Sequence, residues 1–168
     1  MISAIVLVRP RLRADQLART LSALVPAAVE GLVSQALLAG ETIGAAERVV
    51  ADHAGCDVVL GTGEADAVQR ALIHAARPLV LVLLAGSLPL SDLLGEVGLL
   101  AREEAIDHVL FLRDDPPTLA ARLLGRRAEI LGILASRARL LAVPHPDFGT
   151  LSRIRPSRNL AARARRVP

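Results

Sequence analysis

The sequence predicts an α/β fold built around a mostly parallel central sheet, and three observations carry this prediction. Short runs rich in Val, Ile and Leu recur in the first half of the chain without polar alternation, which is typical of strands covered on both faces. Segments with a helical spacing of apolar residues lie between these runs. The chain has 168 residues, of which 52% are hydrophobic, enough for one core of ordinary size.

The expected elements of the first half alternate between strand and helix. Strands are expected at 3–8, 35–39, 57–60 and 79–84, and helices at 14–24, 45–54 and 65–75. Pro26, Gly55 and Pro78 follow the three helices and are typical of helix ends. This order of elements is that of a doubly wound α/β domain.

After residue 86 the pattern is less regular. We expect a helix over 91–104, a strand over 108–112, a helix over 118–135 and an extended segment over 140–143. Beyond Pro144 the chain has little hydrophobic periodicity. We therefore predict one domain over residues 1–150, followed by a basic tail over 151–168 that forms a loop with a short helix or stays flexible.

The basic residues are unevenly placed along the chain. All 20 basic side chains are arginine and the net charge is only +3. Six arginines crowd the last sixteen residues without an acidic neighbour: Arg153, Arg155, Arg158, Arg163, Arg165 and Arg166. Such a tail can contact RNA, anionic lipid headgroups or an acidic protein face. Aromatic residues make up 1% of the chain, so base stacking and a specific nucleic-acid role are disfavoured.

Features of the whole chain argue against two further classes, disulfide-stabilised secreted proteins and membrane-spanning proteins. The single cysteine, Cys56, excludes an internal disulfide and fits a reducing compartment. The apolar start "ISAIVLV" lacks the basic leader of a signal peptide. The longest apolar run, residues 79–90, is too short to span a bilayer. We therefore expect a cytoplasmic protein without a transmembrane segment.

The carboxyl ends of the four predicted strands form the expected ligand-binding edge, because ligands bind there in doubly wound sheets. The residues at these ends are Arg9, Pro10, Gly40, Glu41, Gly61, Thr62, Gly63, Leu84, Ala85 and Gly86. The turn Gly61-Thr62-Gly63 precedes a helix, where backbone N–H groups can cradle a phosphate. Asp66 stands where the third glycine of a dinucleotide motif belongs, so a plain turn with Asp66 in the first helical turn is the favoured interpretation.

Four segments resemble, in matching order, the family 2 glycosyltransferases with a GT-A fold, specifically short bacterial members. The segment "ISAIVLVRPRLRADQLARTLSALVPAAVEGLV" resembles the family's opening strand, turn and helix. The segment "SQALLAGETIGAAERVVADHAGCDVV" is similar to its second strand, its "VVDGGSTDAT" turn and the helix and strand that follow. Two later segments, "AVQRALIHAARPLVLVLLAGS" and "RARLLAVPHPDFGTLSR", are similar to "ALNxGLxxAxGxxLLFLDADT" and "RLLGLPYGDQGLLI". The resemblance covers residues 1–153 and implies a Rossmann-like, three-layer GT-A fold.

The resemblance also implies where the family's carboxylates would fall. In this family an aspartate after the second strand contacts the nucleotide base, and D-x-D carboxylates after the fourth strand hold a divalent cation on the donor phosphates. The matching positions here are Gly40 and Ala45 for the first turn and Gly86 for the metal ligand. The family's catalytic base follows the "GDQG" segment, whereas residues 152–168 contain no Asp or Glu. Only Asp147 matches a family carboxylate, on the acceptor side.

Three hypotheses about function follow, and the first is preferred. It is a degenerate, C-terminally truncated pseudoenzyme, with no catalytic or metal-binding residues and no cofactor, that acts as a binding, scaffold or assembly subunit through protein contacts. The second is an active nucleotide-sugar-dependent glycosyltransferase whose site is metal-independent or completed by a partner and uses Arg9, Asp147 and the Gly61–Gly63 turn. The third is an anion- or RNA-binding module that uses the arginine-rich tail.

A protein partner or a homo-oligomer is expected from one further pattern. Loss of the family's last third would expose apolar surface where its final helices pack, and the helix predicted over 118–135 is broadly apolar. Its large apolar residues are Leu123, Leu124, Ile130, Leu131, Ile133 and Leu134. Exposed apolar patches of this kind mark partner surfaces. A nucleotide-sugar is a less favoured ligand, and nucleic acid is the least favoured.

Overall fold

Strand β1, Ile2–Val8, has all seven residues buried, as its continuous apolar run predicts. In the computed structural model, which describes residues 1–89, 92–100, 108–114 and 128–166, β1 pairs in parallel with β2 (Val33–Gly40) and β4 (Leu79–Leu84). Strand β3 (Asp57–Leu60) pairs in parallel with β2. The four strands predicted for the first half are therefore confirmed, each to within two residues.

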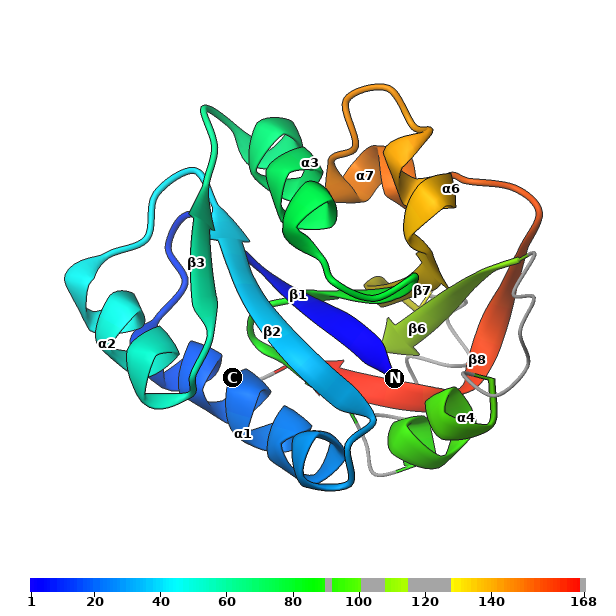
Figure 1. The fold of residues 1–168 in the computed structure, drawn as a ribbon, viewed down its shortest axis with the longest axis horizontal. Coiled ribbons are helices and arrows are strands. Elements are labelled where there is room, and N and C mark those ends of the chain that lie inside the picture. Colours follow the sequence, from blue (N-terminus) through cyan, green and yellow to red (C-terminus); the bar gives the residue numbers. More distant parts are fainter. Residues whose placement is uncertain (90–91, 101–107, 115–127, 167–168) are drawn as a thin grey trace.

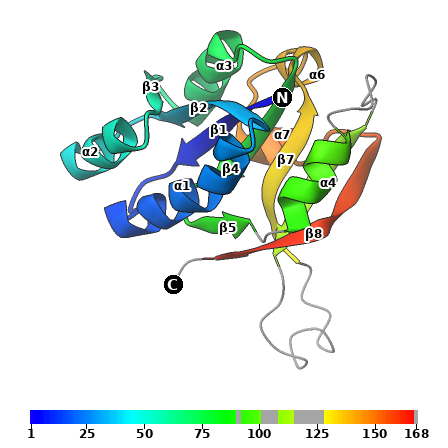
Figure 2. The ribbon, with the colours of Figure 1, turned by 60° about the horizontal axis from the view of Figure 1, so that its bottom comes forward.

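The three predicted helices connect these strands on both faces of the sheet. They are α1 (Ala14–Val29), α2 (Ala45–His53) and α3 (Glu64–His74). Figures 1 and 2 show α1 and α2 on one face and α3 on the other. This placement follows from right-handed crossovers, because β2 and β3 step outward from β1 whereas β4 lies on the opposite side of β1.

The second half of the chain extends the sheet with antiparallel pairs. Strand β7 (Ile130–Ser136) lies between β4 and β6 (Val109–Asp114) and is antiparallel to both. Strand β8 (Ser157–Arg166) then pairs in parallel with β6 and antiparallel with β5 (Ser87–Pro89). The strand order over the described residues is β3-β2-β1-β4-β7-β6-β8-β5.

The sheet curls, and the connection between β4 and β5 explains why. Only Ala85 and Gly86 separate these two strands in the chain, yet β4 lies in the middle of the strand order and β5 at its end. The far end of the sheet must therefore return toward the end of β4. As a result, β8 and β5 come to lie near α1 and the strand ends at the expected ligand edge (Figure 2).

Three shorter helices complete the described fold. Helix α4 (Asp92–Leu100) packs against β8, α6 (Arg137–Leu141) follows β7, and α7 (Phe148–Leu151) follows a loop. The predicted helix over 91–104 is confirmed for 92–100, and the predicted strand over 108–112 is confirmed as β6. No helix in the part of the chain that the structure describes is long and apolar enough to cross a membrane.

Two predictions for residues 118–143 are wrong. Residues 130–136 form β7 instead of a helix; Leu131, Ile133 and Leu134 are buried in the core, and Ile130 is partly buried against it. They therefore do not form the apolar partner surface expected there, while Leu123 and Leu124 lie outside the described residues. The segment expected to be extended over 140–143 is not a strand: α6 spans residues 137–141, and a turn follows it.

The expected conformation of the basic tail is also wrong for residues 157–166. These residues form β8, a ten-residue strand, instead of a short helix or a flexible segment. Leu160 and Ala164 are buried, with exposed fractions of 2% and 0%. The arginine-rich segment is thus paired with the sheet on both of its edges, and Arg166 lies opposite Ser87 at the start of β5.

Candidate functional site

The carboxyl ends of β1, β2, β3 and β4 meet at one edge of the sheet, as the parallel order predicts. Val8 pairs with Gly40, and Gly40 pairs with Leu60. A Cβ atom added to Gly40 would lie 3.0 Å from the carbonyl oxygen of Val8, so this position leaves little room for a side chain. Local packing therefore favours glycine at this position, which is matched to the family's base-contacting aspartate.

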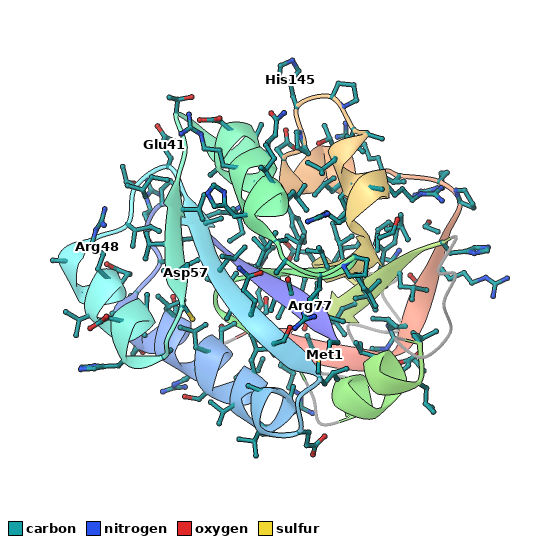
Figure 3. The ribbon with its side chains drawn as sticks, viewed as in Figure 1. Met1, Glu41, Arg48, Asp57, Arg77 and His145 are labelled. Atoms are coloured by element: carbon teal, nitrogen blue, oxygen red, sulfur yellow. The ribbon has the colours of Figure 1, made fainter. Side chains whose placement is uncertain are left out.

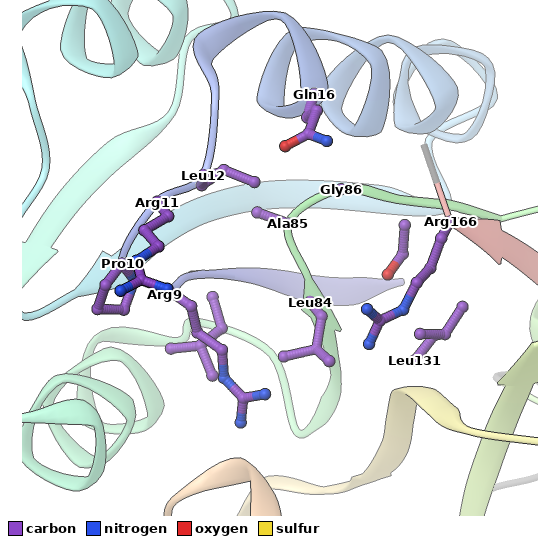
Figure 4. Close-up of a pocket in the computed structure, with 12 residues that line it drawn as sticks. Arg9, Pro10, Arg11, Leu12, Gln16, Leu84, Ala85, Gly86, Leu131 and Arg166 are labelled. Carbon is purple, nitrogen blue, oxygen red and sulfur yellow. The ribbon is translucent and has the colours of Figure 1, made fainter. Parts of the chain in front are cut away.

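A cavity of about 270 Å³ opens over the ends of β1 and β4. Its lining includes four leucines and three arginines: Leu7, Leu12, Leu84, Leu131, Arg9, Arg11 and Arg166. Figure 4 shows the guanidinium groups of Arg9 and Arg166 on either side of Leu84, and Gln16 reaching in from α1. Among the described residues, no acidic side chain lines this cavity. The site combines apolar walls with positive charge.

The cavity brings together only part of the predicted edge. Arg9 and Pro10 line it, as do Ala85 and Gly86. Gly40, Glu41 and the Gly61–Gly63 turn are not among its lining residues. Glu41 is exposed and points outward at the end of β2 (Figure 3).

Arg9 is held by a network that joins β1, α3 and α7. Its Nε and Nη2 atoms donate to the two carboxylate oxygens of Glu64 at 2.9 and 3.0 Å. The backbone N–H of Phe148 donates to the same carboxylate at 2.9 Å. The Arg9 guanidinium also lies 5.5 Å from the centre of the Phe148 ring, within cation–π range. The network fixes the direction of the Arg9 side chain at the mouth of the cavity.

Asp147 has a local structural partner. Its Oδ1 atom accepts a hydrogen bond from the backbone N–H of Thr150 at 2.7 Å, which caps the first turn of α7. Asp147 is not among the residues that line the cavity. Its position in the structure is that of a helix cap next to Phe148, one of the partners in the Arg9 network.

At the Gly61–Gly63 turn, the carboxylate of Asp66 takes the place that a bound phosphate would need. Asp66 accepts hydrogen bonds from the backbone N–H of Thr62 at 2.8 Å and from its hydroxyl at 3.3 Å. Arg70 donates to the other oxygen of Asp66 at 2.9 Å. The Arg70 and Thr62 hydrogen bonds hold the pKa of the Asp66 carboxyl below its usual range. A bound phosphate would have to displace an ionised carboxylate from Thr62.

Gly86 adopts a conformation that suits glycine. Its φ is +86°, in the left-handed region that residues with a Cβ atom rarely enter. Its N–H donates to the buried hydroxyl of Thr20 at 2.9 Å, and that hydroxyl donates to the carbonyl of Gln16 at 3.1 Å. An aspartate in this conformation would carry a backbone cost of about 1 kcal/mol. The turn after β4 is thus built around a glycine.

The described residues contain no group of three or more His, Cys, Asp and Glu side chains that could hold a metal ion. Positive charge at the cavity comes instead from two segments of the chain: Arg9 and Arg11 directly after β1, and Arg166 at the end of β8. Arg166 arrives from β8 and pairs with Glu129. Sequence reasoning named Arg166 only as a tail residue and missed Arg11 and Gln16. The dense arginines in "RPRLR", directly after β1, were the signal for Arg11.

The other five tail arginines do not line the cavity. All five are exposed: Arg153, Arg155, Arg158, Arg163 and Arg165. Arg155 donates to the hydroxyl of Ser157 at 3.2 Å, within its own segment. Whether these side chains contact a partner stays a prediction.

Replacing Glu64 with alanine is expected to lower the free energy of unfolding by about 1–2 kcal/mol. Glu64 and Arg9 side chains are 30% and 45% exposed, so solvent screening keeps the ion pair itself below about 1 kcal/mol. The remaining loss comes from the Phe148 N–H, which is left without its acceptor. Urea unfolding followed by circular dichroism measures the change. Glu41→Ala is the control, because Glu41 is exposed, and equal losses in the two variants would contradict the network.

No protein-family model matches the chain, and no curated protein matches it. Solved structures do match. Glucosyl-3-phosphoglycerate synthase from Mycobacterium tuberculosis in complex with phosphoglyceric acid has a TM-score of 0.67 and 18% sequence identity, covering 89% of this chain and 62% of that chain. The same enzyme in complex with Mn²⁺, UDP and phosphoglyceric acid has a TM-score of 0.66 and 19% identity, covering 89% and 60%. A third structure, of a mycobacterial protein, has a TM-score of 0.65 and 19% identity, covering 89% of this chain and 58% of that chain.

These likenesses establish the fold. The chain has a GT-A glycosyltransferase-like, mixed α/β fold with a curled central sheet, and the fold class predicted from the sequence is confirmed. The chain spans about three fifths of the length of the structures it matches. Identities this low establish fold alone, because one fold hosts many functions.

Proposed function

We propose that this chain is a glycosyltransferase-like protein that does not transfer sugars and acts as a binding or assembly subunit through protein contacts. One observation carries the proposal. Leu84, Ala85 and Gly86 stand at the end of β4, where the resemblance places the metal-binding aspartate. Mn²⁺ and Mg²⁺ need hard oxygen ligands, whereas the adjacent cavity offers guanidinium groups that repel a cation.

The conformation of Gly86 supports the same conclusion. The position matched to the metal ligand carries no side chain, and its left-handed backbone, at φ +86°, favours glycine. Among the matched structures, the Mycobacterium tuberculosis synthase was solved with Mn²⁺ and UDP. We infer that a metal-bridged donor complex of that kind does not form at the end of β4 in this chain.

An active glycosyltransferase is the weaker candidate. The residues proposed for it were Arg9, Asp147 and the Gly61–Gly63 turn. Asp147 caps α7, and the N–H of Thr62 is bonded to Asp66. Only Arg9 lines the cavity, and an arginine alone supplies neither a general base nor a metal ligand.

The assembly part of the proposal is supported by exposed valines on the α1–α2 face. Val25 and Val29 on α1 are 54% and 81% exposed, and Val49 on α2 is 55% exposed. The two helices pack against each other on the same face of the sheet. Val25 and Val29 are four residues apart and lie on one face of α1, and an exposed apolar pair of this kind favours a protein partner at α1.

Calorimetry with UDP, GDP and their sugars, with and without Mn²⁺, tests the proposal together with a sugar-transfer assay. We expect Mn²⁺ to leave the affinity for each nucleotide unchanged and no sugar to be transferred. Micromolar binding that appears only with Mn²⁺, or turnover of a nucleotide-sugar, would contradict the proposal. Light scattering on the same samples tests self-assembly. We expect the average molar mass of the native chain to rise with protein concentration, and that of Val29→Asp to rise less. A native chain that stays monomeric at high concentration would contradict self-assembly.

A further inference from the structure

We propose that helix α1 pairs with the same helix of a second copy of this chain, in an antiparallel, two-fold symmetric arrangement. This inference rests on the assembly part of the proposed function and deepens it, because it names the partner and the register of the contact. The carrying observation is an exposed, uncharged face on α1 that is flanked by one arginine and one glutamate. In Figure 1, α1 runs along the lower edge of the molecule.

The uncharged face of α1 combines small side chains with exposed valines. Ala18, Ser22, Val25 and Val29 follow one another at spacings of four, three and four residues, so they lie on one face of the helix. Val25 and Val29 are 54% and 81% exposed, whereas Ala18 is half-buried. A partner that covers the two valines removes apolar surface from water, which favours association.

One charged residue stands beside each end of this face, and no charged residue lies between the two. Arg19 and Glu30 are eleven residues apart, about three helical turns, so they lie on the same side of the helix. Both are exposed, and neither side chain has an ion pair or a hydrogen bond within the described residues. Glu30 is the C-cap of α1, where the helix dipole disfavours negative charge, and the last turn holds no basic residue. A cation from outside the helix would therefore stabilise this end of α1.

Antiparallel pairing with a second copy matches large side chains to small ones. When Ala18 lies opposite Val29 of the second copy, Ser22 lies opposite Val25 of the second copy. Each valine then meets a small residue, so the helices can approach closely while the valines are covered. The face of α1 is thus complementary to itself.

The same register brings opposite charges together. Arg19 is level with Ala28 of the second copy, two residues and about 3 Å along the axis from Glu30 of that copy. A two-fold axis perpendicular to the helix pair keeps the two residues on one side of the pair, so the arginine of each copy meets the glutamate of the other. In a parallel pair, arginine would face arginine and glutamate would face glutamate, and like charges repel. The charge pattern therefore selects the antiparallel arrangement.

The interface is small, so we expect a weak dimer. The sixteen residues of α1 give a face about 24 Å long and about 10 Å wide. This area lies below the roughly 800 Å² per partner that a standard stable interface buries. Exposed ion pairs also contribute little each and are screened by salt. Association is therefore measured at high protein concentration and low salt.

Light scattering of the full chain tests the charge pair. We expect Arg19→Glu and Glu30→Arg each to weaken dimerisation roughly tenfold, because each variant places two like-charge contacts in the symmetric pair. The double variant Arg19→Glu/Glu30→Arg should return to the native dissociation constant, since both ion pairs form again with their charges exchanged. Arg153→Glu is the matched control, because it makes the same charge change at an exposed arginine outside α1 and should leave dimerisation unchanged.

Disulfide trapping tests the register. In a Cys56→Ala background, chains that carry Ala18→Cys should cross-link to chains that carry Val29→Cys when the two are mixed and oxidised, because these positions lie opposite each other. Neither variant should cross-link alone, since two copies of one position are eleven residues, about 16 Å, apart along the axis.

Three results would overturn the inference. They are a native chain that stays monomeric at millimolar concentration, a double charge variant that associates as weakly as the single variants, and cross-linking that is no stronger in the mixture than within each variant. The last two results would leave the assembly part of the proposed function standing, because the chain would still associate through another contact. Turnover of a nucleotide-sugar, in contrast, would remove the proposed lack of sugar transfer while leaving the α1 pair as measured.

Discussion

Replacing Gly61 with alanine is expected to lower the free energy of unfolding by about 3 kcal/mol, because backbone atoms fill the space that the new methyl group needs. A Cβ atom at this position would lie 2.2 Å from the backbone nitrogen of Ala67 and 2.6 Å from its Cα atom. The carbonyl carbon of Asp66 would lie 2.8 Å away. None of these atoms can rotate aside, so β3 and the start of α3 would have to move apart. Urea unfolding followed by circular dichroism measures the loss.

Gly63 provides the control from the same turn. A Cβ atom there would meet no heavy atom within 4 Å, and its φ of −179° is extended backbone that any residue adopts. Gly63 is the N-cap of α3, where alanine is less favourable than glycine, so Gly63→Ala should cost less than about 1 kcal/mol. Similar losses in the two variants would contradict the close approach at Gly61.

The two glycines show why this motif was ambiguous in the sequence. A glycine-rich turn before a helix serves either to approach a phosphate or to let a helix pack closely on a strand. The sequence pattern is the same in both cases. The deciding residue is Asp66, whose carboxylate accepts the Thr62 N–H that a phosphate would need, and its place in the first helical turn was visible in the sequence.

The first half of the fold was predictable because its signals are local. Continuous apolar runs mark strands buried on both faces, and Gly55 ends α2 in the expected left-handed conformation at φ +67°. The end of α1 was less predictable, since the helix continues through Pro26 to Val29. Ala27, directly after the proline, is fully buried, so the last turn of the helix packs in the core.

The second half depends on pairing between distant residues, which local patterns do not contain. Residues 130–135 are apolar throughout, and such a run fits a buried strand as well as a buried helix. In β8 the buried Leu160 and Ala164 are four residues apart, a spacing that also suits a helix face. Only the partners β6 and β5 decide in favour of a strand.

The same contrast applies to the candidate site. Arg9 and Pro10 were predictable, because they directly follow the first strand of a parallel sheet. Arg166 was not, because its place at the cavity depends on its pairing with Ser87 across almost eighty residues of chain. The sequence also could not reveal that Asp147 would cap α7, since the capped helix is only four residues long.

Replacing Leu160 with alanine is the second large expected effect, with a loss of about 3 kcal/mol in the free energy of unfolding. Leu160 is 2% exposed and belongs to the hydrophobic core, so truncation removes apolar burial and leaves a cavity. The result tests whether the arginine-rich segment is part of the cooperative fold. A flexible tail would show no loss, and urea unfolding of the full chain distinguishes the two.

Arg158→Ala is the matched control on the same strand. Arg158 is exposed, so its truncation should change the free energy of unfolding by less than about 0.5 kcal/mol. Equal losses in the two variants would mean that the effect of Leu160→Ala does not come from the burial of its side chain.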